Sequence, residues 1–218
     1  MHPARKYAAI ADPVTVATFR ALVEAIVPQS PAYAAYGAEY AAGAVELHVH
    51  EYMIWELDHW LSLHSGLSLT VFPLAAPTAA MLNAGAEQLI ASGQAQGPLN
   101  YAVQGGAFAS LSPFDRIRTL AMLENLQVDL GLLPPPYRDD GGFLVFMIDF
   151  LNRGTMFGNY SEWSAYGTTR LATPVARRLE YFPISWKQVG YPGVSMGYRA
   201  LRGFMLTIVR EGGESIIV

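Results

Sequence analysis

Two short sequences constrain this chain towards helices, because each places a capping residue directly before a proline: Asp12–Pro13 and Ser112–Pro113. An Asp or Ser side chain accepts a hydrogen bond from a free N–H at a helix start, and proline fits the first helical position because it lacks that N–H. Apolar residues then recur at the spacing of one helical face: Val16, Phe19, Leu22, Val23 and Ile26. Pro28 is expected to end this first helix.

Four further helices follow from periodicity and stop signals. Their expected ranges are 44–64 closed by Gly66, 78–92 capped by Thr78 and ended by Gly93, 112–130, and 143–157. The last of these is apolar on nearly all sides, so we expect a buried central helix there. A short helix around 174–181 with Thr173 as cap is also expected, and residues 30–42, 67–77, 94–106 and 134–136 are expected to connect these helices.

The last third of the chain is irregular. Residues 152–218 hold 9 glycines and 10 aromatic residues with little periodicity, and no strand pairs stand out. A long irregular stretch is unusual in a compact domain unless it has a function or binds something, and its aromatic content argues against simple disorder. The expected architecture is an all-α, irregular helical single domain, 1–218, with a helical body (1–151) and a loop-rich docking extension (152–218).

Charge is scarce and unevenly placed. Only 15% of residues are charged, against about 25% in ordinary soluble domains. Either part of the surface is covered by another protein or the chain is simply rich in alanine. Residues 1–151 have a net charge of −8 and residues 152–218 a net charge of +4. The basic part is too dilute for nucleic-acid binding and suits an acidic protein surface better.

Several classes of protein are excluded or disfavoured by absences in the sequence. The chain has no cysteine, so disulfides and thiolate chemistry are excluded. No stretch reaches the ~18–20 apolar residues that cross a bilayer, so no transmembrane segment is expected. No apolar segment follows Arg5 and Lys6, so we expect a cytoplasmic protein, or a periplasmic one if an export signal has been removed.

A polar group on the predicted helix 44–64 offers metal ligands. Glu56 and His59 are three residues apart and would point to one side of a helix, as in di-iron carboxylate proteins. Those sites need a second such pair, which the chain lacks. A stand-alone metal-binding helical enzyme using His48, Glu56 and His59 is therefore the alternative hypothesis, against an exposed helix face with solvated histidines.

The other possible catalytic residues are expected to have structural roles. Ser195 lies in a Gly-x-Ser-x-Gly sequence, but no apolar strand precedes it and no clear helix follows, so a loop serine is expected. Asp149 lies inside the apolar helix, where a buried carboxylate needs a partner, and Arg153 one turn later can supply it. The sequence contains neither a P-loop motif nor a dinucleotide-binding glycine motif.

Aromatic residues are the most distinctive feature of the last third. They are Tyr160, Trp163 and Tyr166, together with the segment 186–193, Trp-Lys-Gln-Val-Gly-Tyr-Pro-Gly. Aromatic residues with few acids suit the core of a protein–protein interface. The other interpretation is a loop folded over the domain's own core.

Three segments resemble the small subunit (subunit 3) of gluconate 2-dehydrogenase and related membrane-linked flavin dehydrogenases. They are Phe-Arg-Ala-Leu-Val-Glu-Ala-Ile-Val-Pro at 19–28, Leu-Ser-Pro-Phe-Asp-Arg-Ile-Arg at 111–118, and the segment 186–193. The first is similar to the family's opening helix, the second to its Ser-Pro helix start, and the third to its C-terminal Trp…Gly-Tyr-Pro-Gly signature. Members commonly begin with a twin-arginine export signal, which is not visible here.

The resemblance implies an all-helical accessory subunit of a hetero-oligomer. The expected partner is a large FAD-dependent catalytic subunit of the glucose-methanol-choline class that oxidises sugars, sugar acids or other alcohols. The small subunit would help it mature, with no catalytic residue, cofactor or metal of its own. The residues expected at the interface are Trp186, Tyr191, Pro192, Gly193, Tyr160, Trp163 and Tyr166, with Arg177, Arg178, Arg199 and Arg202 adding charge complementarity.

Overall fold

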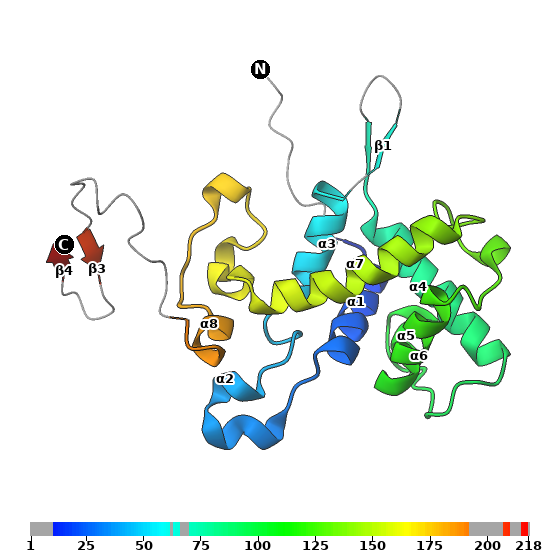
Figure 1. Cartoon of the computed structure of the whole chain (residues 1–218), viewed down its shortest axis with the longest axis horizontal. Coiled ribbons are helices and arrows are strands. Elements are labelled where there is room, and N and C mark those ends of the chain that lie inside the picture. The colour runs from blue at the N-terminus through cyan, green and yellow to red at the C-terminus, as the bar shows by residue number, and fades with distance from the viewer. Residues whose placement is uncertain (1–10, 62, 66–69, 192–206, 210–214, 218) are drawn as a thin grey trace.

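The computed structural model describes residues 11–61, 63–65, 70–191, 207–209 and 215–217, and they form a mainly helical protein (Figure 1). The α-helices are α1 (Pro13–Ile26), α2 (Ala38–Ala41), α3 (Val49–His59), α4 (Ala75–Ala91), α5 (Gly106–Ser110), α6 (Pro113–Glu124), α7 (Gly141–Tyr160) and α8 (Ile184–Gln188). Four 3-10 helices connect them: η1 (Pro31–Tyr36), η2 (Leu130–Leu132), η3 (Trp163–Thr169) and η4 (Pro174–Ala176). Two short antiparallel hairpins pair β1 (Leu63–Ser65) with β2 (Thr70–Phe72), and β3 (Thr207–Val209) with β4 (Ser215–Ile217). The predicted all-α class is confirmed.

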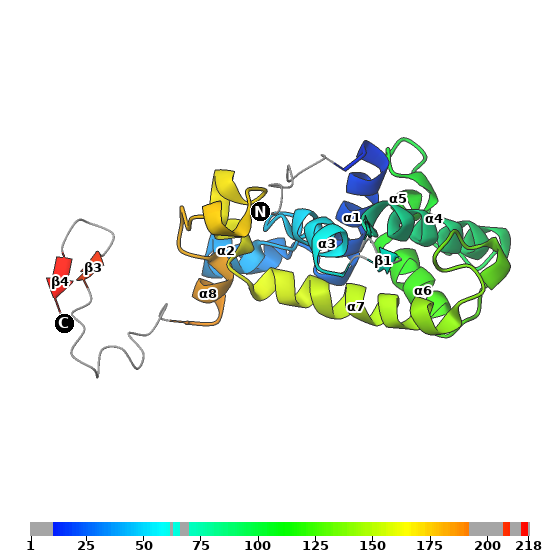
Figure 2. The same ribbon diagram turned by 90° about the horizontal axis from the view of Figure 1, so that it is seen from above.

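The long helix α7 organises the molecule. It crosses the front of the view in Figure 1 and lies along one edge in the view from above, with α1 and α3 packed behind its middle (Figure 2). Helices α4, α5 and α6 gather at its N-terminal end, and α2, α8 and η3 at its C-terminal end. The core between these helices contains Phe19, Leu22, Met53, Leu82, Phe108, Leu123 and Met147, all fully buried.

Both predicted helix starts are confirmed. Asp12 Oδ1 accepts a hydrogen bond from Thr15 N at 3.0 Å, and Ser112 Oγ accepts one from Asp115 N at 3.3 Å. The first helix ends at Ile26, two residues before Pro28, as expected. Helices α1 and α6, which begin at these two caps, pack on each other in the core.

Helices α3 and α7 cross closely at two glycines of α7. A Cβ on Gly158 would lie 2.5 Å from Tyr52 Cδ1 and 2.8 Å from Val49 Cγ1. A Cβ on Gly154 would lie 3.0 Å from Met53 Sδ, the end of a flexible side chain. Real Cβ atoms do not approach an aromatic ring this closely, so the crossing requires glycine at 158.

The predicted helix 44–64 is wrong at both ends. His48 adopts a left-handed conformation (φ 56°), which an α-helix does not continue through, so α3 starts only at Val49. The helix ends at His59, and strand β1 follows within the predicted range. Helix α4 begins at Ala75, so Thr78 is not its cap. Instead, the hydroxyl of Thr78 lies 2.6 Å from Tyr137 Oη in the core.

Two predictions about the middle of the chain also need correction. Helix α6 stops at Glu124 rather than near residue 130, and Leu126 has a positive φ of 54°. Helix α7 spans the predicted range and more, but it is not buried on all sides, because Phe146 is 47% and Phe157 68% exposed. No element of the described chain covers its outer face. The prediction of a helix buried on all sides is therefore wrong, although its residues are apolar on nearly every side.

The described residues of the last third, 152–191, 207–209 and 215–217, contain more regular structure than predicted. Helix α7 continues to Tyr160, Trp186 lies within α8, and β3 pairs with β4, although no strand pair was expected. The helix expected from residue 174 is only the three-residue η4, and the side chain of Thr173 makes no capping bond. The ion pair between Asp149 and Arg153 forms as predicted, but its side chains are 44% and 75% exposed, so the carboxylate is not buried.

Candidate functional site

The structure spreads the predicted interface residues over several environments. Tyr160 at the end of α7 is 50% exposed, and Tyr191 after α8 is 43% exposed. Trp163 is 3% exposed and belongs to the interior, while Tyr166 and Trp186 are half-buried. The predicted interface residues Pro192, Gly193, Arg199 and Arg202, and the loop serine Ser195, lie outside the described residues.

Trp186 packs within its own segment. Its ring lies 5.7 Å from that of Phe182 and 4.9 Å from that of Tyr191, both in edge-on contacts. Ser185 Oγ donates a hydrogen bond to Ser161 O at 3.0 Å, which ties α8 to the end of α7. The segment therefore forms a small aromatic cluster that is anchored to the body and still half-exposed, a surface made of rigid rings.

Arg177 is used inside the protein rather than at its rim. Its guanidinium carbon lies 4.1 Å from the ring centre of Trp55 and 4.7 Å from that of Trp163. Burial lowers the pKa of Arg177 from its ordinary value, against the opposing charge of Glu56. Cation–π contacts of this kind hold the 170s loop against α3. The neighbouring Arg178 is exposed and stays available for a partner.

The structure does not bring His48 together with Glu56 and His59. Burial raises the pKa of Glu56, although a hydrogen bond from Tyr52 and the charge of Arg177 counteract it. His59 stacks on Trp55, with ring centres 5.0 Å apart, and its Nδ1 is 2.8 Å from Trp55 O. Glu56 and His59 are therefore engaged with the aromatic cluster around Arg177.

A different group of potential ligands meets at the start of α3. Among the described residues, His48, His50 and Glu51 form the group of three metal-binding side chains whose ligand atoms all lie within 4.8 Å of one another. His48, which has a left-handed backbone conformation, places its Nδ1 3.3 Å from Glu51 Oε1. Helical spacing pairs His48 with Glu51, three residues apart, but it places His50 on another side, so it did not indicate the group of three.

The charges of this group are set by its surroundings. Burial lowers the pKa of His50 to about 4, so its imidazole is neutral near pH 7. Burial opposes the charge on Glu51, but hydrogen bonds from His48 and Arg170 outweigh it and lower the pKa of Glu51 to about 2. Arg170 Nε donates to Glu51 Oε2 at 2.9 Å. The group thus holds a neutral histidine beside an ionised carboxylate.

An open cavity of about 390 Å³ adjoins this group. Its wall includes His48 and Arg170 together with polar side chains of η3, Ser164 and Thr168. Glu46 and Tyr181 complete the polar part of the wall. The cavity gives a small molecule or solvent direct access to His48.

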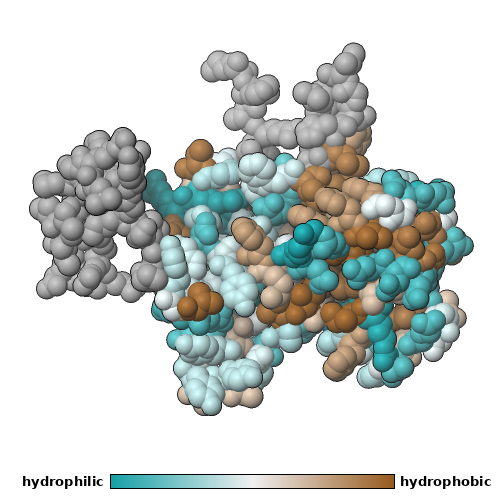
Figure 3. All heavy atoms as spheres, viewed as in Figure 1, coloured by the Kyte–Doolittle hydropathy of each residue, from teal (hydrophilic) through white to brown (hydrophobic). Residues whose placement is uncertain are grey.

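The outer face of α7 is a second candidate surface. We call it the α7 outer face and define it by Phe146, Phe157 and Tyr160, with the Asp149–Arg153 ion pair between them. Positions 146 and 157 are eleven residues apart, close to three helical turns, so they share a side. Figure 3 shows hydrophobic residues gathered on the side of the molecule that α7 crosses, with hydrophilic groups among them.

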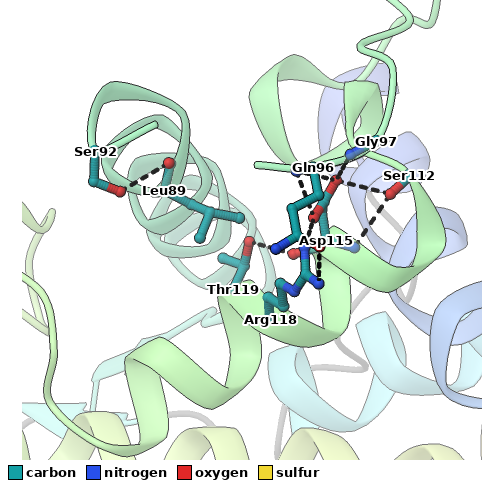
Figure 4. A network of polar contacts seen from close by, with 8 residues as sticks. All are labelled: Leu89, Ser92, Gln96, Gly97, Ser112, Asp115, Arg118 and Thr119. Carbon is teal, nitrogen blue, oxygen red and sulfur yellow. Dashed lines mark hydrogen bonds and ion pairs between the residues drawn. The ribbon is translucent and has the colours of Figure 1, made fainter. Parts of the chain in front are cut away.

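The Ser-Pro motif at 111–118 has a structural centre. Asp115 is fully buried and accepts hydrogen bonds from Gly97 N at 2.7 Å, Ser112 Oγ at 2.8 Å and Arg118 Nη1 at 2.9 Å (Figure 4). Gln96 N also donates to it, at 3.1 Å. Burial opposes the charge on this carboxylate, but these donors outweigh it and keep its pKa below its usual range. The network fastens the loop before α5 to the first turn of α6.

Comparison with protein-family models, with curated proteins and with solved structures gives no match to this chain. In the described residues, the search for a helix both long and apolar enough to cross a membrane finds none. The family resemblance of the three motifs therefore stays a prediction that rests on the residues themselves.

Proposed function

We propose that this chain is a non-catalytic small subunit that binds and stabilises an FAD-dependent sugar or alcohol oxidoreductase. The α7 outer face carries this proposal on the structural side, and the resemblance of the three motifs supplies the class of partner. The flavin and the catalytic residues would belong to the partner, a large subunit of the glucose-methanol-choline class.

The α7 outer face has the chemistry of an interface centre. Phe157 is 68% exposed and Tyr160 50% exposed, three residues apart on a helix that is anchored along its inner side. Large aromatic side chains on a rigid element give much contact area at low conformational cost, and such side chains dominate binding energy. The exposed ion pair of Arg153 with Asp149 beside them offers both signs of charge to polar groups of a partner.

The aromatic cluster around Trp186 lies at the same end of α7 and extends this surface. Helix α8 packs against α7 and α2, and Ser185 Oγ donates to Ser161 O directly after α7, so α8 and its aromatic cluster are fixed at the C-terminal end of α7. A partner that covers the C-terminal end of α7 would therefore contact both groups. This arrangement supports docking through one continuous end of the molecule.

Purification of the untagged chain from its native host tests the proposal. We expect a yellow flavoprotein to co-purify in a defined ratio. Phe157→Asp should reduce the recovered flavoprotein at least tenfold, whereas the control Tyr101→Asp should not, since Tyr101 is 78% exposed in the loop before α5. Recovery of the wild-type chain alone as a stable monomer would refute the proposal.

Trp186→Ala separates two forms of the same function. If the cluster around α8 docks the partner, the variant loses assembly. If instead a loop of this chain caps the partner's substrate pocket, the complex forms normally but turns over more slowly. Both readouts come from one preparation, by size-exclusion chromatography and by a dye-reduction assay of the complex.

A second candidate is a metal-binding protein, because three potential ligands meet at the start of α3. The stand-alone enzyme hypothesised from His48, Glu56 and His59 would need these residues to converge, and the structure groups His48 with other partners. Metal analysis of untagged protein tests for an enzyme of this kind, and less than about a tenth of an equivalent of any transition metal in protein from the native host would remove that candidate.

A further inference from the structure

We propose that His48, His50 and Glu51 form a binding site for one transition-metal ion of the Zn²⁺ type, open on one side to the adjoining 390 Å³ cavity. The site goes beyond the docking function, because neither the α7 outer face nor the cluster around Trp186 contributes to it.

The donor set is the first observation that carries the site. Two imidazoles and one carboxylate are ligands that Zn²⁺ accepts, and three protein ligands leave a coordination position for water or a substrate. The ligand atoms lie within 4.8 Å of one another, whereas atoms bound to one tetrahedral Zn²⁺ lie about 3.4 Å apart, given bonds of about 2.1 Å. Metal binding therefore requires the three side chains to draw closer together.

His50 is the second and independent observation. It is only 7% exposed, and its Nδ1 is buried without a hydrogen-bond partner. A buried polar atom without a partner costs free energy, so each one calls for an explanation. For His50, which lies beside two other potential ligands, a bound metal ion would supply one, either by taking a ring nitrogen directly or by fixing the tautomer of the ring.

The backbone holds the ligands together. His48 and His50 would point to different sides of a continuous helix. With His48 in the left-handed conformation, the centres of the two rings lie 6.1 Å apart, and His48 Nδ1 lies 3.3 Å from Glu51 Oε1. A non-glycine residue in this conformation is uncommon, and such residues cluster at functional sites.

Arg170 supports the carboxylate from outside. It donates to Glu51 Oε2, so the metal would take Oε1 and replace the contact that Oε1 makes with His48 Nδ1. Ligating carboxylates commonly have a hydrogen-bond partner of this kind, which orients them. The positive charge of Arg170 also makes the site weaker than one without it and favours a ligand that accepts hydrogen bonds in the cavity, such as water or a small anion.

A titration of the untagged, chelator-treated full-length chain with Co²⁺ and then Zn²⁺ tests the site. We expect one equivalent of Co²⁺ to bind with the intense visible absorption of four-coordinate Co²⁺, and Zn²⁺ to abolish that absorption. His50→Gln and His48→Asn should each weaken binding at least tenfold. The second variant guards against a folding defect, since His48 is 41% exposed and asparagine tolerates the left-handed conformation.

The matched controls are Glu56→Gln and His59→Gln, which alter the ligands chosen from helical spacing and should leave Co²⁺ binding unchanged. The proposal is overturned if wild-type protein binds Co²⁺ no better than His48→Asn. It is also overturned if the two control variants abolish binding while His48→Asn retains it. Either result leaves co-purification of the flavoprotein unaffected, so this test and the docking test fail separately.

Discussion

Replacement of Asp115 by asparagine should destabilise the protein although the two side chains have nearly the same shape. The carboxylate is fully buried, with Gly97 N, Ser112 Oγ and Gln96 N at one oxygen and Arg118 Nη1 and Gln96 N at the other. An amide keeps one acceptor oxygen and replaces the other by a donor. If the amide oxygen takes the position of Oδ2, Arg118 Nη1 loses its acceptor; if it takes the position of Oδ1, Gly97 N and Ser112 Oγ lose theirs. Gln96 N keeps an acceptor in either case. At least one donor to the charged carboxylate is therefore left without an acceptor.

The magnitude follows from the one bond that is lost in the better orientation. A hydrogen bond to a charged group contributes about 1.5–3 kcal/mol, so Asp115→Asn should lower the free energy of unfolding by about 1.5–3 kcal/mol. For a domain of this size the melting temperature should fall by roughly 3–12 °C. Denaturant unfolding followed by circular dichroism measures the first quantity and a thermal melt the second.

A matched control separates this network from helix capping. Asp140 caps α7 by accepting from Phe143 N at 2.9 Å in an exposed position, and asparagine caps helices about as well as aspartate. Asp140→Asn should therefore change stability by less than about 0.5 kcal/mol. A loss below about 1 kcal/mol for Asp115→Asn would refute the reasoning, because it is smaller than one charged hydrogen bond.

The same network has a defined pH dependence. Because the folded pKa of Asp115 is below its unfolded value of about 3.9, its contribution is fully present above that unfolded value. It is lost as the pH falls through the folded pKa. The stability difference between wild type and Asp115→Asn should be constant near neutral pH and shrink in acid.

Two further predictions use neighbouring residues as controls. Gly158→Ala should lower the free energy of unfolding by about 1–3 kcal/mol in denaturant unfolding, because the new Cβ meets an aromatic ring. Gly154→Ala should lower it by less than about 1 kcal/mol, because the methionine end that it meets is flexible and can move. Equal effects of the two variants would contradict this crossing geometry. Arg177→Ala should lower the free energy of unfolding by about 1–3 kcal/mol and change tryptophan emission, since two indole rings contact the guanidinium. The control Arg178→Ala, at an exposed residue, should change neither. Unchanged stability and emission in Arg177→Ala would mean that the stacking contributes nothing.

Local sequence signals predicted the parts of the fold that depend on local chemistry. The caps at Asp12 and Ser112 act within three residues, so sequence alone located both helix starts. The long-range hydrogen bonds to Asp115 could not be predicted from the sequence, because Gln96 and Gly97 reach it from a loop about twenty residues away. No sequence pattern near either partner indicates that contact.

Errors arose where one residue overrode a periodic pattern or where tertiary context decided burial. The left-handed His48 breaks an otherwise helical pattern, and it moved the candidate ligands from Glu56 and His59 to His50 and Glu51. The apolar composition of α7 predicted a helix but not its position at the surface. Hydropathy describes a helix alone, whereas exposure depends on which neighbours pack around it.

The four tryptophans lie in different environments, so intrinsic tryptophan fluorescence can report on two parts of the protein separately. Trp55 and Trp163 are 8% and 3% exposed beside a cation, whereas Trp60 is 70% exposed and Trp186 half-buried in the α8 cluster. Emission from the buried pair reports the integrity of the interior, and emission from Trp186 reports events at the end of α7. If a partner binds at that end, the emission of Trp186 should shift while the emission of the buried pair stays constant. Unfolding would change both, so one emission spectrum distinguishes association from unfolding without an added dye.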